Sequence, residues 1–369
     1  PERLYVPEER AIGLAEGDST VYWAIKRANR AQIVSLTCNI RNYEVRTGAV
    51  LKNLTARVVA PGKLVTGATP KFQNNKPEPK PKMPKGLLVC ATNIQNYFYD
   101  LGGYAHRKTT KEQQTIQTEK ISKALTHINA DIYAICEIQK GDSAAQMLVD
   151  AMNAKAKKVQ YAYVSQGWSN GDTISCGDIY RTDRVRPYGD LQYGYHDPSS
   201  HYHYRMVACG FEEIKSGERF VLNINHLRSK RGTGDASNSK RMVNVDSLLV
   251  MLDKIEKEQL FGDKDILLVG DYNCYSQEQP IQTLIRAGYE DILMQYDSAG
   301  YSYVYHSEAG YLDRAFASPT MAVQVKAVHP YHLNADYFYS RGYKRRLDKT
   351  MFRYADHDPI LISIQLGDK

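Results

Sequence analysis

The segment Ile266-Leu267-Leu268-Val269-Gly270-Asp271-Tyr272-Asn273 places four apolar residues before a glycine and then adds acidic and amide side chains. This pattern predicts a short buried strand whose polar residues emerge at its end. Apolar runs that end in asparagine, glutamate or histidine recur in three other places: residues 87–93, 132–137 and 221–226. Because strand ends and loops on a rigid scaffold carry most protein chemistry, these four ends are the candidate functional part of the chain.

Helical patterns alternate with these strands. Over residues 112–128, Ile116, Leu125 and Ile128 fall near one helical face. Further helices are predicted at 143–156, 242–255 and 280–286, and a hairpin is predicted from strands at 205–211 and 220–225. Hairpins mixed with strand–helix units predict an α+β fold in which layered sheets are covered by helices.

A proline-rich stretch divides the chain. Residues 76–86 contain four prolines and several lysines, which excludes a helix or central strand and predicts an extended linker. Residues 1–75 predict a small β-rich domain with strands near 32–36, 49–51 and 56–59. Residues 87–369 are the expected catalytic domain.

Composition excludes some classes of protein and leaves others open. Charged residues make up 24% of 369 residues, which is ordinary for a folded protein. There is no run of about 18 apolar residues, so no membrane span is expected. The net charge of +7 favours a polyanionic partner. The six cysteines form no zinc-type cluster. The chain starts at Pro1, and we expect that a segment preceding it, such as a secretory signal, was removed or left out.

The polar residues at the strand ends suit phosphodiester hydrolysis. Each one alone has an ordinary explanation, such as a turn or a solvated strand end. Together they supply two histidines, three aspartates, one glutamate and two asparagines. Oxygen ligands suit Mg²⁺ or Mn²⁺ rather than zinc, and a histidine held by a carboxylate can take a proton from water. Asp313 and His357 are the expected partners for that step.

Seven short motifs resemble the endonuclease/exonuclease/phosphatase superfamily, which includes pancreatic-type deoxyribonuclease. They occur in the family's order across residues 87–369: T-N-I-Q-N at 92–96, A-D-I-Y-A-I-C-E-I at 130–138, Y-R-T-D-R-V at 180–185, N-H-L-R-S-K at 225–230, G-D-Y-N at 270–273, L-D-R at 312–314 and D-H-D-P at 356–359. The resemblance implies a four-layer α/β/β/α sandwich, a divalent cation (Mg²⁺ or Mn²⁺, with Ca²⁺ as an alternative) and hydrolysis of nucleic acid.

The resemblance also implies a role for each matching residue. The metal ligands would be Glu137 and Asn93, with Asp356 assisting at the metal or the phosphate. The general base would be His357, oriented by Asp313. The remaining catalytic residues would protonate the leaving group or orient the phosphate and nucleophile: His226, Asp271 and Asn273. Arg205 matches a phosphate-binding arginine, and Asp172 and Asp178 are candidates for orienting His226.

Within the superfamily, the chain is most similar to bacterial extracellular nucleases, which also have a β-rich region before the catalytic domain. This likeness rests on N-H-L-R-S-K followed by a glycine-containing loop, and on H-L-N-A-D at 332–336. It implies a secreted or cell-envelope location. Three positions depart from the family pattern: Cys136 for glutamine, Arg314 for histidine and Ala355 for serine.

Basic residues beside these motifs favour a nucleic-acid substrate, with DNA as the expected one. Arg228, Lys230 and Arg231 follow His226, and residues 341–346 precede the D-H-D-P motif. Their ordinary interpretation is as solvated surface loops. Two other functions stay open: a phosphatase or phospholipid phosphodiesterase on the same fold, and a non-catalytic binding module. No protein partner can be inferred.

Overall fold

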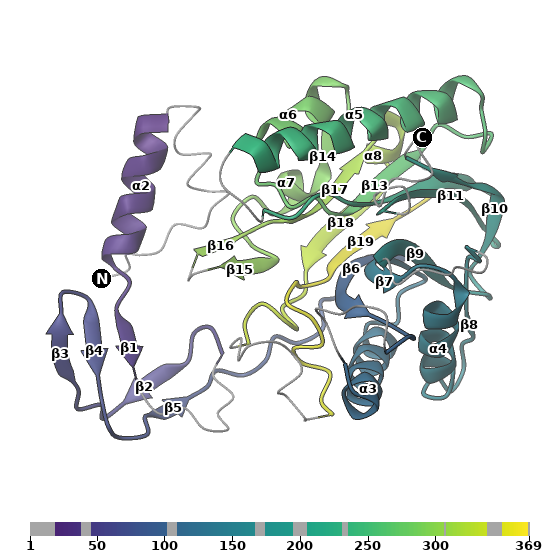
Figure 1. Cartoon of the computed structure of the whole chain (residues 1–369). Helices are drawn as coiled ribbons and strands as arrows, with labels where there is room; N and C mark the ends of the chain where they lie inside the picture. Colours follow the sequence, from purple (N-terminus) through teal and green to yellow (C-terminus); the bar gives the residue numbers. More distant parts are fainter. Residues whose placement is uncertain are drawn as a thin grey trace.

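Two six-stranded sheets form the centre of the molecule (Figure 1). The computed structural model describes residues 19–37, 46–101, 109–166, 174–194, 205–230, 235–305, 308–337 and 349–367. The first sheet has the order β18-β19-β6-β7-β9-β8. Its strands are β6 (Leu87–Tyr97), β7 (Ile132–Gln139), β8 (Tyr161–Tyr163), β9 (Ile174–Arg181), β18 (Val325–Pro330) and β19 (Ile360–Ile364).

The second sheet has the order β10-β11-β12-β13-β17-β14. Its strands are β10 (Val185–Tyr193), β11 (Met206–Glu213), β12 (Arg219–His226), β13 (Ile266–Asp271), β14 (Glu290–Asp291) and β17 (Asp313–Ala317). The predicted hairpin is the antiparallel pair β11–β12, and the four predicted apolar strands are β6, β7, β12 and β13.

Alternation of side chains along the strands builds three hydrophobic layers. Val89 and Ala91 of β6 pack between the sheets, together with residues of the second sheet such as Leu222 and Leu267. Cys90, between them in sequence, faces the opposite side and packs against helices. This alternation follows from the two-residue period of a strand. It gives a helix–sheet–sheet–helix arrangement, so the predicted α/β/β/α sandwich is confirmed.

Each outer face of the sandwich is covered by helices. The first sheet is covered by α3 (Lys111–Ile128) and α4 (Asp142–Asn153), and the second by α5 (Asp235–Lys257) and α6 (Gln279–Arg286). A capping box fixes the start of α3, because Thr110 accepts from Gln113 N and the Gln113 side chain reaches back. The α5 helix extends beyond the predicted 242–255 at both ends. The smaller elements are α7 (Ile292–Tyr296), β15 (Tyr303–Tyr305), β16 (Glu308–Gly310) and α8 (Pro319–Ala322).

The front segment, residues 1–75, differs in part from the prediction of short strands alone. Residues Ser19–Ala31 form helix α2 instead. This range has three alanines and three basic residues and lacks glycine and proline, so its composition favours a helix. The predicted strands are present in shifted form. They belong to two small sheets made of β1 (Ser35–Thr37), β3 (Arg57–Ala60) and β4 (Lys63–Val65), and of β2 (Val50–Lys52) and β5 (Lys71–Gln73).

Residues 76–86 have neither helix nor strand and lie along the first sheet. Glu78 accepts hydrogen bonds from His332 N (3.0 Å) and pairs with His329 Nε2 (3.0 Å). Ser363 donates to Pro84 O at 3.1 Å. The linker is therefore attached to the sandwich by hydrogen bonds. In the described part of the chain, no helix combines the length and apolar character needed to cross a bilayer.

Candidate active site

Strand register brings the predicted polar residues to one edge of the sandwich. In the parallel pair β12–β13, His226 lies opposite Asp271. In the antiparallel pair β13–β17, Asp271 lies opposite Asp313. In the parallel pair β6–β7, Asn93 lies opposite Cys136, so the next residue, Glu137, follows at the same edge. Carboxyl ends of parallel strands share an edge, which is why residues far apart in sequence meet here.

The backbone is strained at this edge. Glu137 and Asn273 have positive φ angles of 64° and 51°. Gly270, with φ of 127°, precedes Asp271, and a Cβ there would lie 2.1 Å from Asn225 O. Only glycine fits that position. Left-handed conformations at non-glycine residues concentrate at functional sites.

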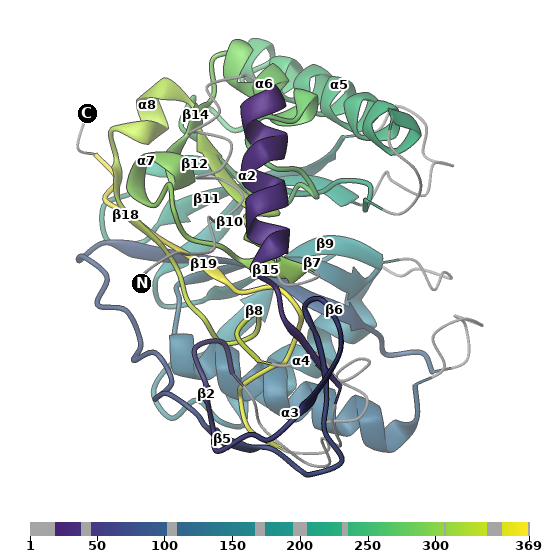
Figure 2. The same cartoon turned by 90° about the vertical axis from the view of Figure 1, so that its left-hand side faces the viewer.

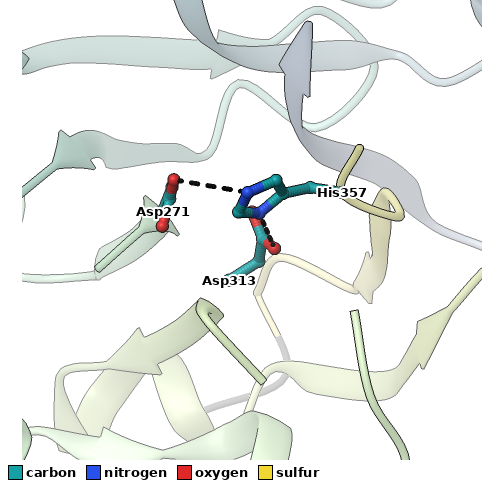
Figure 3. Close-up of side chains that lie close together, drawn as sticks. All are labelled: Asp271, Asp313 and His357. Carbon is teal, nitrogen blue, oxygen red and sulfur yellow. Dashed lines mark hydrogen bonds and ion pairs between the residues drawn. The ribbon is translucent and has the colours of Figure 1, made fainter. Parts of the chain in front are cut away.

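His357 and Asp313 form a buried hydrogen-bonded pair (Figure 3). His357 Nδ1 lies 2.8 Å from Asp313 Oδ2, and both side chains are at least nine-tenths buried. Ser302 Oγ donates to the same carboxylate oxygen at 2.7 Å. The ring of Tyr303 lies against that of His357, with 4.5 Å between centroids. With Nδ1 turned to the carboxylate, Nε2 of His357 is the nitrogen that can accept a proton.

Asp271 is the centre of the site. Its Oδ2 accepts from Asn93 Nδ2 at 3.2 Å, and its Oδ1 accepts from Asn273 N at 2.9 Å. Nε2 of His357 lies 3.9 Å from Asp271 Oδ2, and Nε2 of His226 lies 3.7 Å from the same atom. The two histidines therefore approach one carboxylate from different elements, the end of β12 and the loop before β19.

Burial and neighbouring charges shift the acid–base behaviour of this group. Burial raises the pKa of Asp271, and repulsion from Asp313 and Glu137 adds to the rise. Burial alone would lower the pKa of His357, but the Asp313 and Asp271 carboxylates raise it well above the ordinary value. Acidic and basic groups whose pKa values are shifted by burial and by neighbouring charges are typical of active sites.

The acidic residues fit a divalent cation. Glu137 Oε1 and Asp271 Oδ2 both lie 3.7 Å from His226 Nε2, and the Glu137 charge raises the pKa of Asp271. A cation between these carboxylates would remove that repulsion. Asp271, Asp313 and His357 also have ligand atoms within 4.8 Å of one another. We favour Glu137 and Asp271 as the ligands, because Asp313 already binds His357 and Ser302.

The other predicted residues lie near the edge or outside the described part. Asp356 is half-buried, and its charge contributes to the raised pKa of His357. Met206 pairs with Asn225, so Arg205 is placed beside the end of β12. Arg228 N is bound by Asn244 Oδ1 at 3.0 Å, and Lys230 forms an ion pair with Glu278. Arg231, Asp172 and residues 341–346 lie outside the described residues.

Of the two candidates for orienting His226, Asp172 lies outside the described residues, and Asp178 is the one that the structure describes. Asp178 is buried on β9, where burial raises its pKa to about 8, and no described contact joins it to His226. Among the described residues, the carboxylates of Glu137 and Asp271 lie within 4 Å of His226 Nε2.

The departures from the family pattern are accommodated by the local structure. Cys136 is buried, and its Sγ donates to Asn225 O at 3.4 Å. Arg314 is fully buried, and its guanidinium binds Ser276 Oγ at 3.0 Å and Asp291 Oδ2 at 3.3 Å. It supports the loop after β13 and the start of α7.

Sequence reasoning missed a second set of residues that hold the His357 loop. Asp358 is fully buried and accepts from Asn334 N (2.6 Å) and Ala335 N (2.9 Å). Its other oxygen lies 2.7 Å from His332 Nδ1. Asn334 Nδ2 donates to His357 O at 2.6 Å. The H-L-N-A-D motif at 332–336 was the available signal, since it supplies all of these partners.

Comparison with known proteins gives the fold. Neither a family model nor a curated protein matches the sequence. Among solved structures, an endonuclease/exonuclease/phosphatase family protein from Bacteroides thetaiotaomicron is similar, with a TM-score of 0.53 and 16% identity over 76% of this chain and 98% of that one. A protein of the same description from Bacteroides vulgatus has a TM-score of 0.52 and 14% identity over 77% of this chain and 100% of that one.

A third similar structure is a mannosyl-6-phosphatase of Bacteroides thetaiotaomicron, with a TM-score of 0.52 and 15% identity over 75% of this chain and 99% of that one. These identities are low, so the likeness concerns the fold. The layered sheets, the convergence of strand ends and the similar structures agree. The chain has the fold of the endonuclease/exonuclease/phosphatase family.

Proposed function

We propose that the protein is a divalent-metal-dependent phosphodiesterase that hydrolyses nucleic acid, with DNA as the preferred substrate. The observation that carries this proposal is the convergence of His357 and His226 on Asp271, at 3.9 and 3.7 Å. Cleavage of a phosphodiester needs a base for the attacking water and an acid for a poor alkoxide leaving group. Two histidines that approach one carboxylate from different elements can supply both.

His357 is the proposed base. Its Nδ1 is held by Asp313, so Nε2 is free to take the proton from water, and Asp313 stabilises the imidazolium that results. Ser302 keeps the carboxylate in place. His226 is the proposed acid and gives its proton to the leaving oxygen. Asn273 and Arg205 are proposed to orient the phosphate.

A divalent cation, proposed to be Mg²⁺ or Mn²⁺, would be held by Glu137 and Asp271 with help from Asn93 and Asp356. When bound, it supplies positive charge that stabilises the phosphoryl oxygens. Asn93 and Asn273 fix Asp271 through one hydrogen bond to each oxygen. Fixed ligands of this kind lower the cost of reorganisation during the reaction.

A substrate panel tests the proposal. The protein is incubated with supercoiled plasmid, linear duplex, RNA, a sugar phosphate and a phospholipid diester, each with Mg²⁺ and with chelator. We expect metal-dependent cleavage of the nucleic acids, fastest for DNA. Hydrolysis of the sugar phosphate alone would instead establish a phosphatase, the activity named for one of the similar structures. Hydrolysis of the lipid alone would establish a phospholipase-type enzyme. Secretion to the cell exterior or envelope also remains a proposal.

A further inference from the structure

The surplus positive charge of the chain lies in its front part. Residues 1–86 contain 15 basic and 7 acidic residues, a net charge of +8, whereas residues 87–369 have a net charge of −1. The described ranges 19–37 and 46–75 contain eight basic residues and no acidic one. Charge of a single sign concentrated in one region favours a polyanionic partner.

Three of these eight cations attach the front segment to the sandwich. The exposed Arg30 of α2 is one, because its Nε lies 3.2 Å from Glu308 Oε1. Lys26 of α2 is 4% exposed, and its Nζ lies 2.7 Å from Glu308 Oε2. Arg46 Nη2 lies 3.4 Å from Asp336 Oδ2, and its guanidinium lies 4.9 Å from the Tyr337 ring centroid. Because buried ion pairs are costly to break, these contacts fix the position of the front segment.

Both attachment points adjoin the proposed base, His357. Glu308 belongs to β16, which pairs with β15, and Tyr303 of β15 lies against the His357 ring. Asp336 belongs to the segment in which Asn334 donates to His357 O. Figure 2 shows α2 in front of β15 on this side of the molecule. The front segment therefore borders the active site.

The other five cations are available to a ligand. Their side chains are exposed, and they are Arg27, Lys52, Arg57, Lys63 and Lys71. Lys52 and Lys71 lie directly opposite each other in the β2–β5 pair. Like charges in that position destabilise a strand pair, and no described acidic residue contacts either lysine. A phosphate backbone bound there would relieve the repulsion.

We propose that residues 19–75 form a second nucleic-acid-binding surface, which holds the phosphate backbone of a long substrate beside the active site. This inference rests on the proposed function and extends it to substrate length. Contacts made by lysine and arginine to phosphates are independent of sequence and weaken steeply with salt. The surface therefore favours long nucleic acid, whatever its sequence, over small phosphodiesters.

The test compares two full-length variants that each lose four positive charges. K52Q/R57Q/K63Q/K71Q changes the proposed surface. K157Q/K158Q/K254Q/K264Q removes the same charge from exposed lysines of the catalytic part. Binding of a long labelled DNA duplex is measured by fluorescence anisotropy in chelator, where metal-dependent cleavage is prevented, over a range of salt concentrations. Cleavage of the duplex is then compared with hydrolysis of bis(p-nitrophenyl) phosphate.

We expect the front-segment variant to bind duplex at least about tenfold more weakly than the wild type. The slope of its log binding constant against log salt concentration should flatten by about 0.9 for each lost phosphate contact. Its ratio of duplex cleavage to small-substrate hydrolysis should fall. The control variant should keep wild-type affinity and ratio. Equal affinity, slope and ratio in both variants would overturn the inference while leaving the proposed function intact. Selective loss of binding by a protein that never cleaves nucleic acid would support the surface and refute the proposed function.

Discussion

Replacing Asp313 by asparagine isolates the charge that holds His357. The two side chains are similar in shape, so the 2.8 Å contact can persist while the negative charge is lost. Two unit charges about 4 Å apart interact by about 4 kcal/mol at an effective dielectric constant of about 20, which corresponds to about three pKa units as an upper limit. Because Asp271 also raises the pKa of His357 and remains in the variant, we expect that pKa to decrease by less than this limit.

The direction of the pH effect follows from the role of a base. Neutral His357 is the active form, so cleavage rises with pH through its raised pKa. In Asp313→Asn that pKa is lower, and the acidic limb of the kcat/KM profile should move to lower pH. The plateau should fall by about 100-fold or more, because the imidazolium is no longer stabilised and the wrong tautomer can be held.

The assay is the pH profile of plasmid cleavage for the wild type, Asp313→Asn and Asp253→Asn. Asp253 lies on α5 and its side chain is 58% exposed, so its variant makes the same chemical change on the surface and should match the wild type. A lower plateau with an unmoved acidic limb would refute the reasoning, and would indicate that Asp313 acts through the metal instead.

Three further predictions follow from the same contacts. Glu137→Gln should abolish hydrolysis and sharply weaken Mn²⁺ binding in calorimetry, and retention of both would exclude Glu137 as a ligand. Burial alone would lower the pKa of His332, but Asp358 raises it to about 9, so the charged histidine stabilises the fold fully below pH ~6.5 and the effect is lost as pH rises through 9. Burial also raises the pKa of Asp358, so we expect the free energy of unfolding to fall by a net amount of about 1–3 kcal/mol across this pH window. In thermal melts, the melting temperature of His332→Phe should depend less on pH in this window than that of the wild type. An equal dependence in the two proteins would contradict the assignment. A chain of residues 76–369, which keeps Glu78, should fold and hydrolyse small phosphodiesters, and aggregation would show that the front segment is needed for folding.

Much of the fold could be predicted because its signals are local. The apolar run before Asp271 and the helical pattern over 112–128 depend on residues close in sequence, and both elements formed where expected. The α2 helix was missed although the apolar residues of 19–31 recur with a helical period. Its attachment to the sandwich involves contacts far along the chain, such as the hydrogen bond from Lys26 to Glu308, a partner 282 residues away.

The same difference between local signals and contacts far apart in sequence applies to the candidate site. Asp313 and His357 could be paired in advance because each lies in a recognisable short motif next to a strand: Asp313 begins β17, and His357 precedes β19. Ser302 and Tyr303 could not, since they lie on a short hairpin and gain significance only from their position against His357. Lys230 shows the opposite case. Its sequence position favours phosphate binding, but Glu278 already neutralises much of its charge.

The most direct test of the central claim is nicking of supercoiled plasmid by the wild type and by His357→Ala, each in Mg²⁺ and in chelator. We predict rapid nicking by the wild type in Mg²⁺, none in chelator, and a loss of about 100-fold or more in His357→Ala with little change in DNA affinity. Nicking that persists in chelator, or a His357→Ala variant as fast as the wild type, would contradict a metal-dependent mechanism in which His357 is the base.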